Sequence, residues 1–127
     1  MIELNQVYKC DICGNIVEVI HAGAGQLVCC GQPMKLMVPK ETEEGGYEKH
    51  LPVVEKNGDR YNVKVGSIEH PMMDAHWIEW IALDTESGVL RKYLSPGDKP
   101  EASFVSKDKA LRAREYCNLH GHWTTKI

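Results

Sequence analysis

From residue 51 onward, hydrophobic and polar positions alternate in short runs that are separated by turn-forming residues. In one run Tyr61, Val63 and Val65 alternate with polar residues, which is the period of a β-strand with one buried face. This run and the run before it flank Asn57 and Gly58, a dipeptide typical of tight hairpin turns. The pattern therefore predicts a β-hairpin over residues 51–66.

Three further stretches extend this pattern toward the C-terminus. Residues 76–94 contain two apolar runs around Ser87 and Gly88, and residues 100–106 form another short strand candidate. Residues 109–117 have a composition that suits a helix, but the stretch is short and has no clear cap, so we expect a strand like its neighbours. About five to seven short strands at this spacing predict an antiparallel β-sandwich.

The first 37 residues have a different character, because they are rich in Cys and Gly and contain only short apolar runs. A piece of this size cannot be held together by hydrophobic burial alone and needs a metal ion, a disulfide or an oligomeric partner. Residues 38–46 combine Pro39, acidic residues and a pair of glycines without an apolar period, which indicates a linker.

Composition narrows the class of protein. Hydrophobic residues make up 43% of the 127 residues, so a packed core is expected. The net charge is -3 and no basic cluster is longer than a pair, which argues against a nucleic-acid-binding protein. No apolar run is long enough to span a bilayer and no secretory leader is evident, so we expect a cytoplasmic protein without a membrane partner.

Four of the five cysteines lie in the first 30 residues: Cys10, Cys13, Cys29 and Cys30. In a reducing compartment such a cluster indicates metal ligands or redox groups before disulfides. The CxxC spacing of the first pair suits chelation. A disulfide between the adjacent second pair would be strained, because neighbouring Cα atoms are only about 3.8 Å apart. Four thiolates select zinc or iron, and the spacing leaves a zinc ribbon, an iron site and a disulfide framework open.

A second group of candidate ligands is spread over the rest of the chain, mostly at the ends of the predicted strands: His50, His70, His76, Cys117 and His120. Four imidazoles and one thiolate are too many ligands for a tetrahedral structural zinc site. On an octahedral ion they leave one position open for chemistry. The alternative is a zinc half-site of Cys117 and His120 with unrelated histidines. His21 and His122 are not expected to be ligands.

The chain resembles the desulfoferrodoxin family of two-iron superoxide reductases along its whole length. The resemblance rests on the order of its motifs, which are CxxC, CC, EKHLP, HPM, DAH and CNLHG. The resemblance implies a mainly β protein, with a desulforedoxin-like Fe(Cys)4 module over residues 1–37 and a linker over 38–46. An immunoglobulin-like antiparallel β-sandwich with an Fe(His)4Cys site would span residues 47–127. It implies that the first iron is bound by Cys10, Cys13, Cys29 and Cys30. It implies that the second iron is bound by His50, His70, His76 and His120, with Cys117 as the axial ligand.

The resemblance also implies an activity, the one-electron reduction of superoxide to hydrogen peroxide with electrons from a rubredoxin-like donor, usually in a homodimer. We expect Lys49 to attract the superoxide anion to the open position and Glu48 to fill that position after oxidation. We expect His120 to bind through the less common ring nitrogen.

Two other functions fit the residues less well. A zinc ribbon fused to a β-sandwich could act as an interaction or regulatory module, but the surplus of histidines argues against it. An electron-transfer protein with two relay irons would have no use for an open coordination position or for the neighbouring Glu48 and Lys49.

Overall fold

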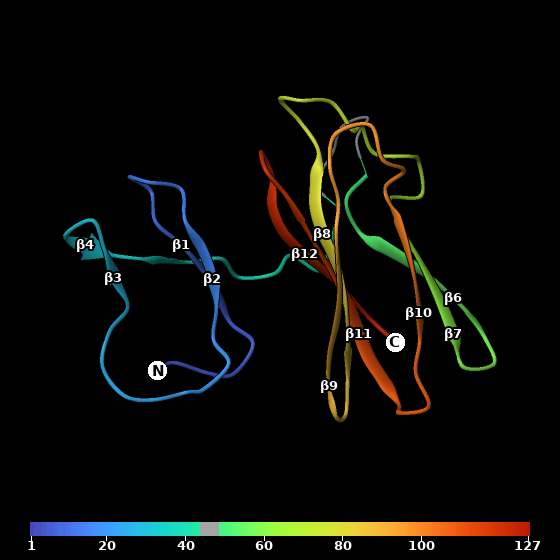
Figure 1. Ribbon diagram of the computed structural model, residues 1–127, viewed down its shortest axis with the longest axis horizontal. Coiled ribbons are helices and arrows are strands. Elements are labelled where there is room, and N and C mark those ends of the chain that lie inside the picture. The colour runs from blue at the N-terminus through green and yellow to red at the C-terminus, as the bar shows by residue number, and fades with distance from the viewer. Residues whose placement is uncertain (44–48) are drawn as a thin grey trace. The chain divides into compact units, whose positions relative to one another are not determined.

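The computed structural model describes residues 1–43 and 49–127, and the chain divides into two compact units, Met1–Val38 and Pro39–Ile127 (Figure 1). The described part of the chain consists of strands and loops only, which confirms the mainly β class. It accordingly contains no helix of the length and apolarity needed to cross a membrane.

The first unit is built from very short strands. They are β1 (Val7–Lys9), β2 (Ile16–Glu18), β3 (Val28–Cys29), β4 (Gln32–Pro33) and β5 (Lys35–Leu36). β1 lies between β2 and β5 in a three-stranded sheet, and β3 pairs with β4. Across residues 1–38, all of which are described, the buried hydrophobic residues are Val7, Cys10 and Val19. A core this small agrees with the expectation that the unit needs a further stabilising element.

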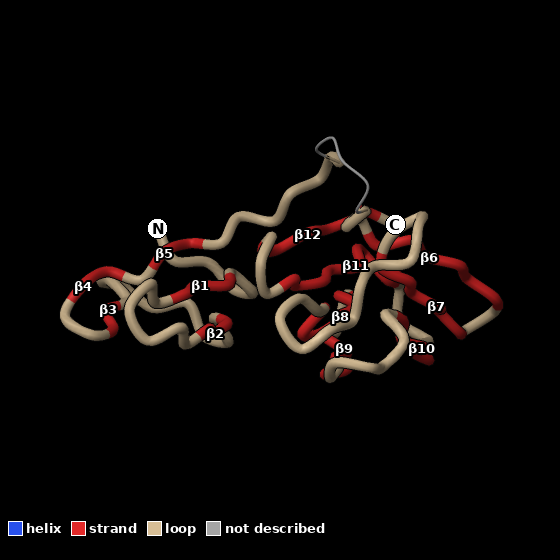
Figure 2. The backbone as a smooth tube through the Cα atoms, turned by 90° about the horizontal axis from the view of Figure 1, so that it is seen from above, coloured by secondary structure: helices blue, strands red, loops and turns tan. Residues whose placement is uncertain are grey.

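The described residues of the second unit form seven antiparallel strands in two sheets, drawn in red in Figure 2. One sheet has the order β10-β7-β6 and the other the order β12-β11-β8-β9. The first, second and fifth strands of the unit thus face the remaining four, which is an immunoglobulin-like arrangement of a sandwich. The strands are β6 (Pro52–Asn57), β7 (Arg60–Val65), β8 (Ile78–Thr85), β9 (Gly88–Tyr93), β10 (Glu101–Val105), β11 (Ala110–Cys117) and β12 (Gly121–Lys126).

The core of the sandwich comes from the alternating positions of these strands. Tyr61, Val63 and Val65 of β7 are at most 3% exposed, as their alternation predicts. They pack in one cluster with apolar residues of the facing sheet, including Ile81 and Leu83 of β8. The stretch 109–117, whose composition suits a helix, is the central strand β11, which confirms the strand prediction.

The first hairpin turn lies one residue later than its dipeptide suggests. Asn57 pairs with Arg60, so the two loop residues are Gly58 and Asp59. Gly58 has a φ of 61°, and a two-residue hairpin loop needs this left-handed conformation at its first position. Glycine adopts it most readily, which explains why the loop begins at Gly58 rather than at Asn57.

The predicted linker is only partly described, because residues 44–46 lie outside the described ranges. Within it, Lys40 forms a parallel bridge with Trp123 of β12. The backbone N–H of Lys40 donates to the carbonyl of His122 at 2.9 Å, and the N–H of Thr124 donates to the carbonyl of Lys40 at 2.9 Å. Lys40 therefore belongs structurally to the edge of the sandwich.

Candidate metal centres

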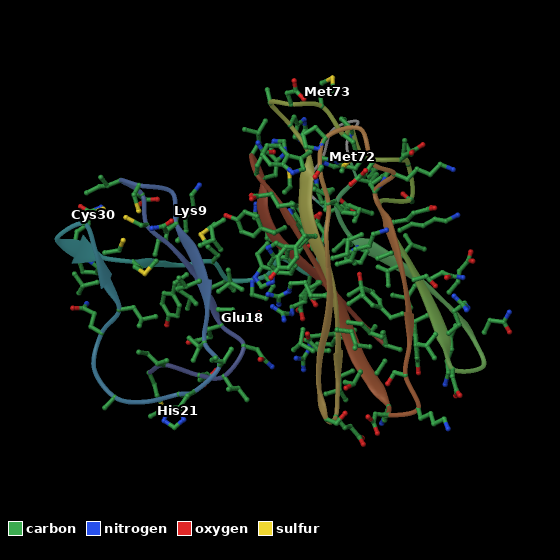
Figure 3. All side chains as sticks on the ribbon, viewed as in Figure 1. Lys9, Glu18, His21, Cys30, Met72 and Met73 are labelled. Atoms are coloured by element: carbon green, nitrogen blue, oxygen red, sulfur yellow. The ribbon has the colours of Figure 1, made fainter. Side chains whose placement is uncertain are left out.

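Four thiols gather where two tight turns of the first unit meet. Cys10 follows β1 and Cys13 comes at the end of the next turn, while Cys29 ends β3 and Cys30, labelled in Figure 3, begins the turn to β4. Their sulfur atoms all lie within 4.8 Å of one another. Cys30 has a φ of 53°, an unusual conformation for a residue with a side chain. This strained conformation accompanies the placement of two adjacent sulfurs in one cluster.

The spacing of the sulfur atoms fits one tetrahedral ion. Sγ of Cys29 lies 3.5 Å from Sγ of Cys13 and 3.9 Å from Sγ of Cys30. Four sulfurs at about 2.3 Å from a common ion lie about 3.8 Å apart, whereas a disulfide requires about 2.05 Å. None of the five cysteines, all of which are described, takes part in a disulfide. The donor set is therefore suited to iron or zinc, and the disulfide framework is not formed.

The electrostatics of the thiol cluster also favour a cation. The backbone N–H of Cys13 donates to Sγ of Cys10 at 3.5 Å, and this hydrogen bond lowers the pKa of Cys10 to about 6. Hydrogen bonding with the neighbouring Cys13 and Cys10 raises the pKa of Cys29 to about 12. Cys10 therefore ionises readily, whereas the raised pKa values of Cys29 and Cys30 oppose their ionisation. A bound metal ion removes this conflict, because it allows all four to be thiolates.

The second cluster forms at one end of the sandwich, where strands from both sheets begin or end. It consists of His50 just before β6, His70 and His76 in the loop between β7 and β8, Cys117 at the end of β11 and His120 in the turn before β12. Four of these side chains are buried and His120 is exposed. One ligand atom from each residue lies within 4.8 Å of all the others. The structure thus brings together all five residues of the predicted set.

The nitrogen atoms of this cluster are spaced as ligands of one ion. Nε2 of His50 lies 3.1 Å from Nε2 of His70 and 3.1 Å from Nδ1 of His120. Adjacent nitrogen ligands at about 2.1 Å from an octahedral ion lie about 3.0 Å apart. Sγ of Cys117 is 3.7 Å from Nε2 of His70 and 3.8 Å from Nδ1 of His120. The ring nitrogen of His120 that faces the cluster is Nδ1, which binds metals less often than Nε2 and agrees with the expectation for this residue.

The loop between β7 and β8 fixes how its two histidines face the cluster. Nδ1 of His70 lies 2.7 Å from the carbonyl oxygen of Pro71, which can only accept, so Nδ1 carries the proton and Nε2 presents its lone pair. His76 and Met73 exchange two backbone hydrogen bonds, of 2.9 and 3.0 Å. Met72 and Met73 come from this same loop (Figure 3).

The segment that carries His50 is held by an acidic side chain that the sequence did not single out. The carboxylate of Glu43 accepts hydrogen bonds from the backbone N–H of His50 at 2.9 Å and of Leu51 at 2.8 Å. A carboxylate that accepts two amides forms strong charge-assisted bonds. Glu43 therefore fixes the backbone at the first histidine of the cluster.

Asn118 ties the Cys117 turn to the loop of His76. Its Oδ1 accepts from the backbone N–H of Trp77 at 2.9 Å, and its Nδ2 donates to the carbonyl of Ala75 at 3.0 Å. These two partners are the neighbours of His76 on either side. The side chain therefore sets the distance between two segments that each carry candidate ligands.

The two predicted catalytic residues precede His50. Glu48 lies outside the described residues. Lys49 is half-buried, and its carbonyl oxygen lies against Gly66, which has a φ of 84°. A Cβ at position 66 would come within 3.0 Å of the carbonyl oxygens of Lys49 and Ile68. The chain can pass this closely only because residue 66 is glycine.

The two remaining histidines belong to neither cluster. His21 is exposed in the first unit. His122 is buried on β12, where its ring lies 5.6 Å from that of Trp80 and its Nε2 lies 3.4 Å from a guanidinium nitrogen of Arg114.

Comparison with protein families gives two matches that together span almost the whole chain. The family described as desulfoferrodoxin, N-terminal domain, matches residues 2–37, and the family described as desulfoferrodoxin matches residues 42–126. Both clusters lie within these matched ranges.

Individual relatives and a solved structure agree with these matches. A desulfoferrodoxin homolog of Archaeoglobus fulgidus is 58% identical over 123 residues, which cover 97% of this chain and 98% of that relative. A desulfoferrodoxin of Nitratidesulfovibrio vulgaris is 58% identical over 118 residues, or 93% of each chain. The crystal structure of the superoxide reductase from Treponema pallidum superposes with a TM-score of 0.81 at 33% identity, covering 95% of this chain and 97% of that one.

Proposed function

This chain belongs to the desulfoferrodoxin family, and we propose that it is a superoxide reductase that acts at the cluster of four histidines and Cys117. The reaction consumes one superoxide, one electron and two protons and yields one hydrogen peroxide. Its physiological value is the removal of superoxide during oxidative stress without release of dioxygen.

One observation carries this proposal: four imidazole nitrogens and one thiolate sulfur converge within 4.8 Å at the end of the sandwich. Five protein ligands leave one position of an octahedron for a small substrate. Iron held by these residues would supply the electron that reduces superoxide. The closed four-cysteine cluster of the first unit has no such free position and suits a site for structure or electron transfer.

We assign the ligands of the two irons as the sequence predicts. The first iron is held by Cys10, Cys13, Cys29 and Cys30, and the second by His50, His70, His76, His120 and Cys117. The spacing of their ligand atoms and the tautomer of His70 support this assignment.

We propose that Lys49 provides a positive charge next to the second centre. Its backbone is held from one side by the ligand His50 and from the other by the close approach of Gly66. A cation at this point raises the local concentration of an anionic substrate. A lysine ammonium can also order a water molecule that delivers protons to the product. For Glu48, which lies outside the described residues, we propose that its carboxylate would bind the iron in the oxidised resting enzyme.

The side chain of Cys117 is fully buried in the core of the sandwich. If Cys117 holds the iron as a thiolate, it would donate electron density to the metal, and we propose that this donation would favour release of hydrogen peroxide over cleavage of its oxygen–oxygen bond. We further propose a rubredoxin-like electron donor, a homodimer and a cytoplasmic location, all supported by the family resemblance alone.

Product stoichiometry in steady state tests the proposed activity. A flux of superoxide is supplied to the iron-loaded protein with an excess of a chemical reductant, and peroxide and dioxygen are measured together. We expect one peroxide for each superoxide above the uncatalysed background, with no dioxygen from the enzyme. A yield of one peroxide and one dioxygen for every two superoxides would identify a dismutase. A peroxide yield no higher than the uncatalysed background would contradict the proposed activity and favour a function in electron transfer alone.

A further inference from the structure

Trp123 contacts two residues of the second cluster that are seventy positions apart in the chain. Its side chain is 2% exposed, and its ring stacks on the imidazole of His50 with centroids 4.6 Å apart and planes inclined by 12°. Its Nε1–H donates to the carbonyl oxygen of His120 at 3.2 Å. One rigid side chain thus touches the ring of one candidate ligand and the backbone of another.

Lys40 completes this arrangement from the segment that enters the sandwich. Its Nζ lies 4.7 Å from the centroid of the Trp123 ring and donates to the same carbonyl of His120 at 3.3 Å. The two backbone hydrogen bonds between Lys40 and β12 hold its main chain beside Trp123. An ammonium over an indole face is attracted by the ring quadrupole, so Lys40 fixes the indole as well as the carbonyl.

Such support matters because an imidazole binds a metal only along the lone pair in its ring plane. Rotation of the ring moves that lone pair away from the ion, and partners outside the ligand set prevent the rotation. Nδ1 of His70 has its own partner in the carbonyl of Pro71, whereas the ring of His50 is held by stacking on Trp123. The carbonyl oxygen of His120 accepts hydrogen bonds from both Trp123 and Lys40. These two bonds fix the turn in which Nδ1 of His120 points toward His50.

We propose that Lys40 and Trp123 are positioning residues that orient His50 and His120 for iron binding at the second centre. The proposal rests on the ligand assignment made above, but it is independent of the substrate on which the centre acts. Its test therefore measures iron retention, which stays informative even if the protein does not reduce superoxide.

Iron release from the full-length, iron-loaded protein tests the proposal. The oxidised protein is mixed with an excess of an iron chelator, and the thiolate-to-iron absorption of each centre is followed separately. For Trp123→Leu we expect iron loss from the second centre to be about tenfold faster or more, which is the usual effect of removing a partner of a metal ligand. The first centre is the internal control and should release iron at the wild-type rate.

Two conservative variants separate stacking from the hydrogen bond. Trp123→Phe keeps a ring against His50 but removes the Nε1–H donor, so we expect a smaller acceleration, by a factor of about three, and an unshifted absorption band of the second centre. Lys40→Met should accelerate release by a similar factor, and Lys40→Arg, which keeps a cation over the indole, should restore the wild-type rate. Lys126→Met removes the same charge from an exposed side chain of the same strand as Trp123 and should have no effect.

Three results would overturn the proposal. The first is a wild-type release rate from the second centre in both Trp123→Leu and Lys40→Met. The second is equal acceleration at both centres, which would show a general loss of stability. The third is equal acceleration by Lys40→Met and Lys126→Met, which would show a simple charge effect. If Trp123→Leu fails to fold, the release rates of Trp123→Phe and of the two Lys40 variants still test the proposal. The Lys40 side chain is exposed, so its variants are expected to fold.

Discussion

At the scale of single residues, we propose that the charge of Lys49 controls how superoxide reaches the second centre. Lys49→Ile should lower the bimolecular rate constant about tenfold at low salt and weaken its dependence on ionic strength, because a steering cation is lost. Pulse radiolysis of the reduced protein at several salt concentrations measures both quantities. Lys49→Arg, which keeps the charge, is the matched control. An unchanged rate constant at low salt would remove Lys49 from the steering role.

Asn118 acts at the same scale through its two hydrogen bonds to the neighbours of His76. Asn118→Ala leaves the N–H of Trp77 without its partner and should lower the free energy of unfolding by about 1–3 kcal/mol. Asn118→Asp keeps the acceptor for Trp77 but loses the donor to Ala75, and it should be less damaging. Urea unfolding gives the energies, and the absorption band of the second centre should shift in the alanine variant. Stability equal to wild type would show that the loops hold their distance without Asn118.

At the scale of elements, we expect the second centre to depend on the close approach of the Lys49 carbonyl to Gly66. Gly66→Ala should destabilise the protein by more than about 1 kcal/mol and slow the reaction with superoxide, because the carbonyl of Lys49 must move away from a new Cβ. Gly97→Ala is the matched control, since Gly97 also has a positive φ, of 93°, but open space around the position of its Cβ. Thermal unfolding and superoxide kinetics of the two variants should therefore differ. Equal effects would show that backbone conformation alone matters at position 66.

The elements themselves were largely predictable from the sequence. The alternation of apolar and polar residues predicted which face of β7 is buried. The CxxC and CC motifs predicted the four-cysteine cluster. The hairpin turn was displaced by one residue, because the composition of a turn does not say which residue takes the left-handed conformation. Local pattern thus determines strands and chelating turns, where the deciding interactions lie between close neighbours in the chain.

The supporting residues of the second centre could not be predicted in this way. Glu43, Asn118 and Trp123 act on segments that the fold brings next to them, and no periodicity in the sequence marks such contacts. Asn118 lies inside the CNLHG motif, so the sequence places it close to the ligands Cys117 and His120. The motif does not indicate that Asn118 forms hydrogen bonds with Ala75 and Trp77. Lys40 lies in a polar stretch of the sequence, and nothing in that stretch predicts the contact between its ammonium group and the Trp123 ring.

At the scale of the whole molecule, the two units should differ in how they respond to the loss of metal. The first unit buries only three hydrophobic residues among its fully described residues 1–38, whereas the second has a continuous core. Cys13→Ser should therefore unfold the first unit, because bound metal supplies much of its stability. The second centre should keep its absorption band. Limited proteolysis and the visible spectrum measure both effects, and protection of residues 1–38 in the variant without the first iron would contradict this prediction.

The most direct test of the central claim is a single turnover of the fully reduced protein after a pulse of superoxide. We predict that the thiolate-to-iron band of the second centre appears at a rate proportional to both the protein and the superoxide concentration. One peroxide should form for each centre oxidised, and no dioxygen should be released. Oxidation of the four-cysteine centre alone, or dioxygen in place of peroxide, would contradict a superoxide reductase whose substrate binds at His50, His70, His76, His120 and Cys117.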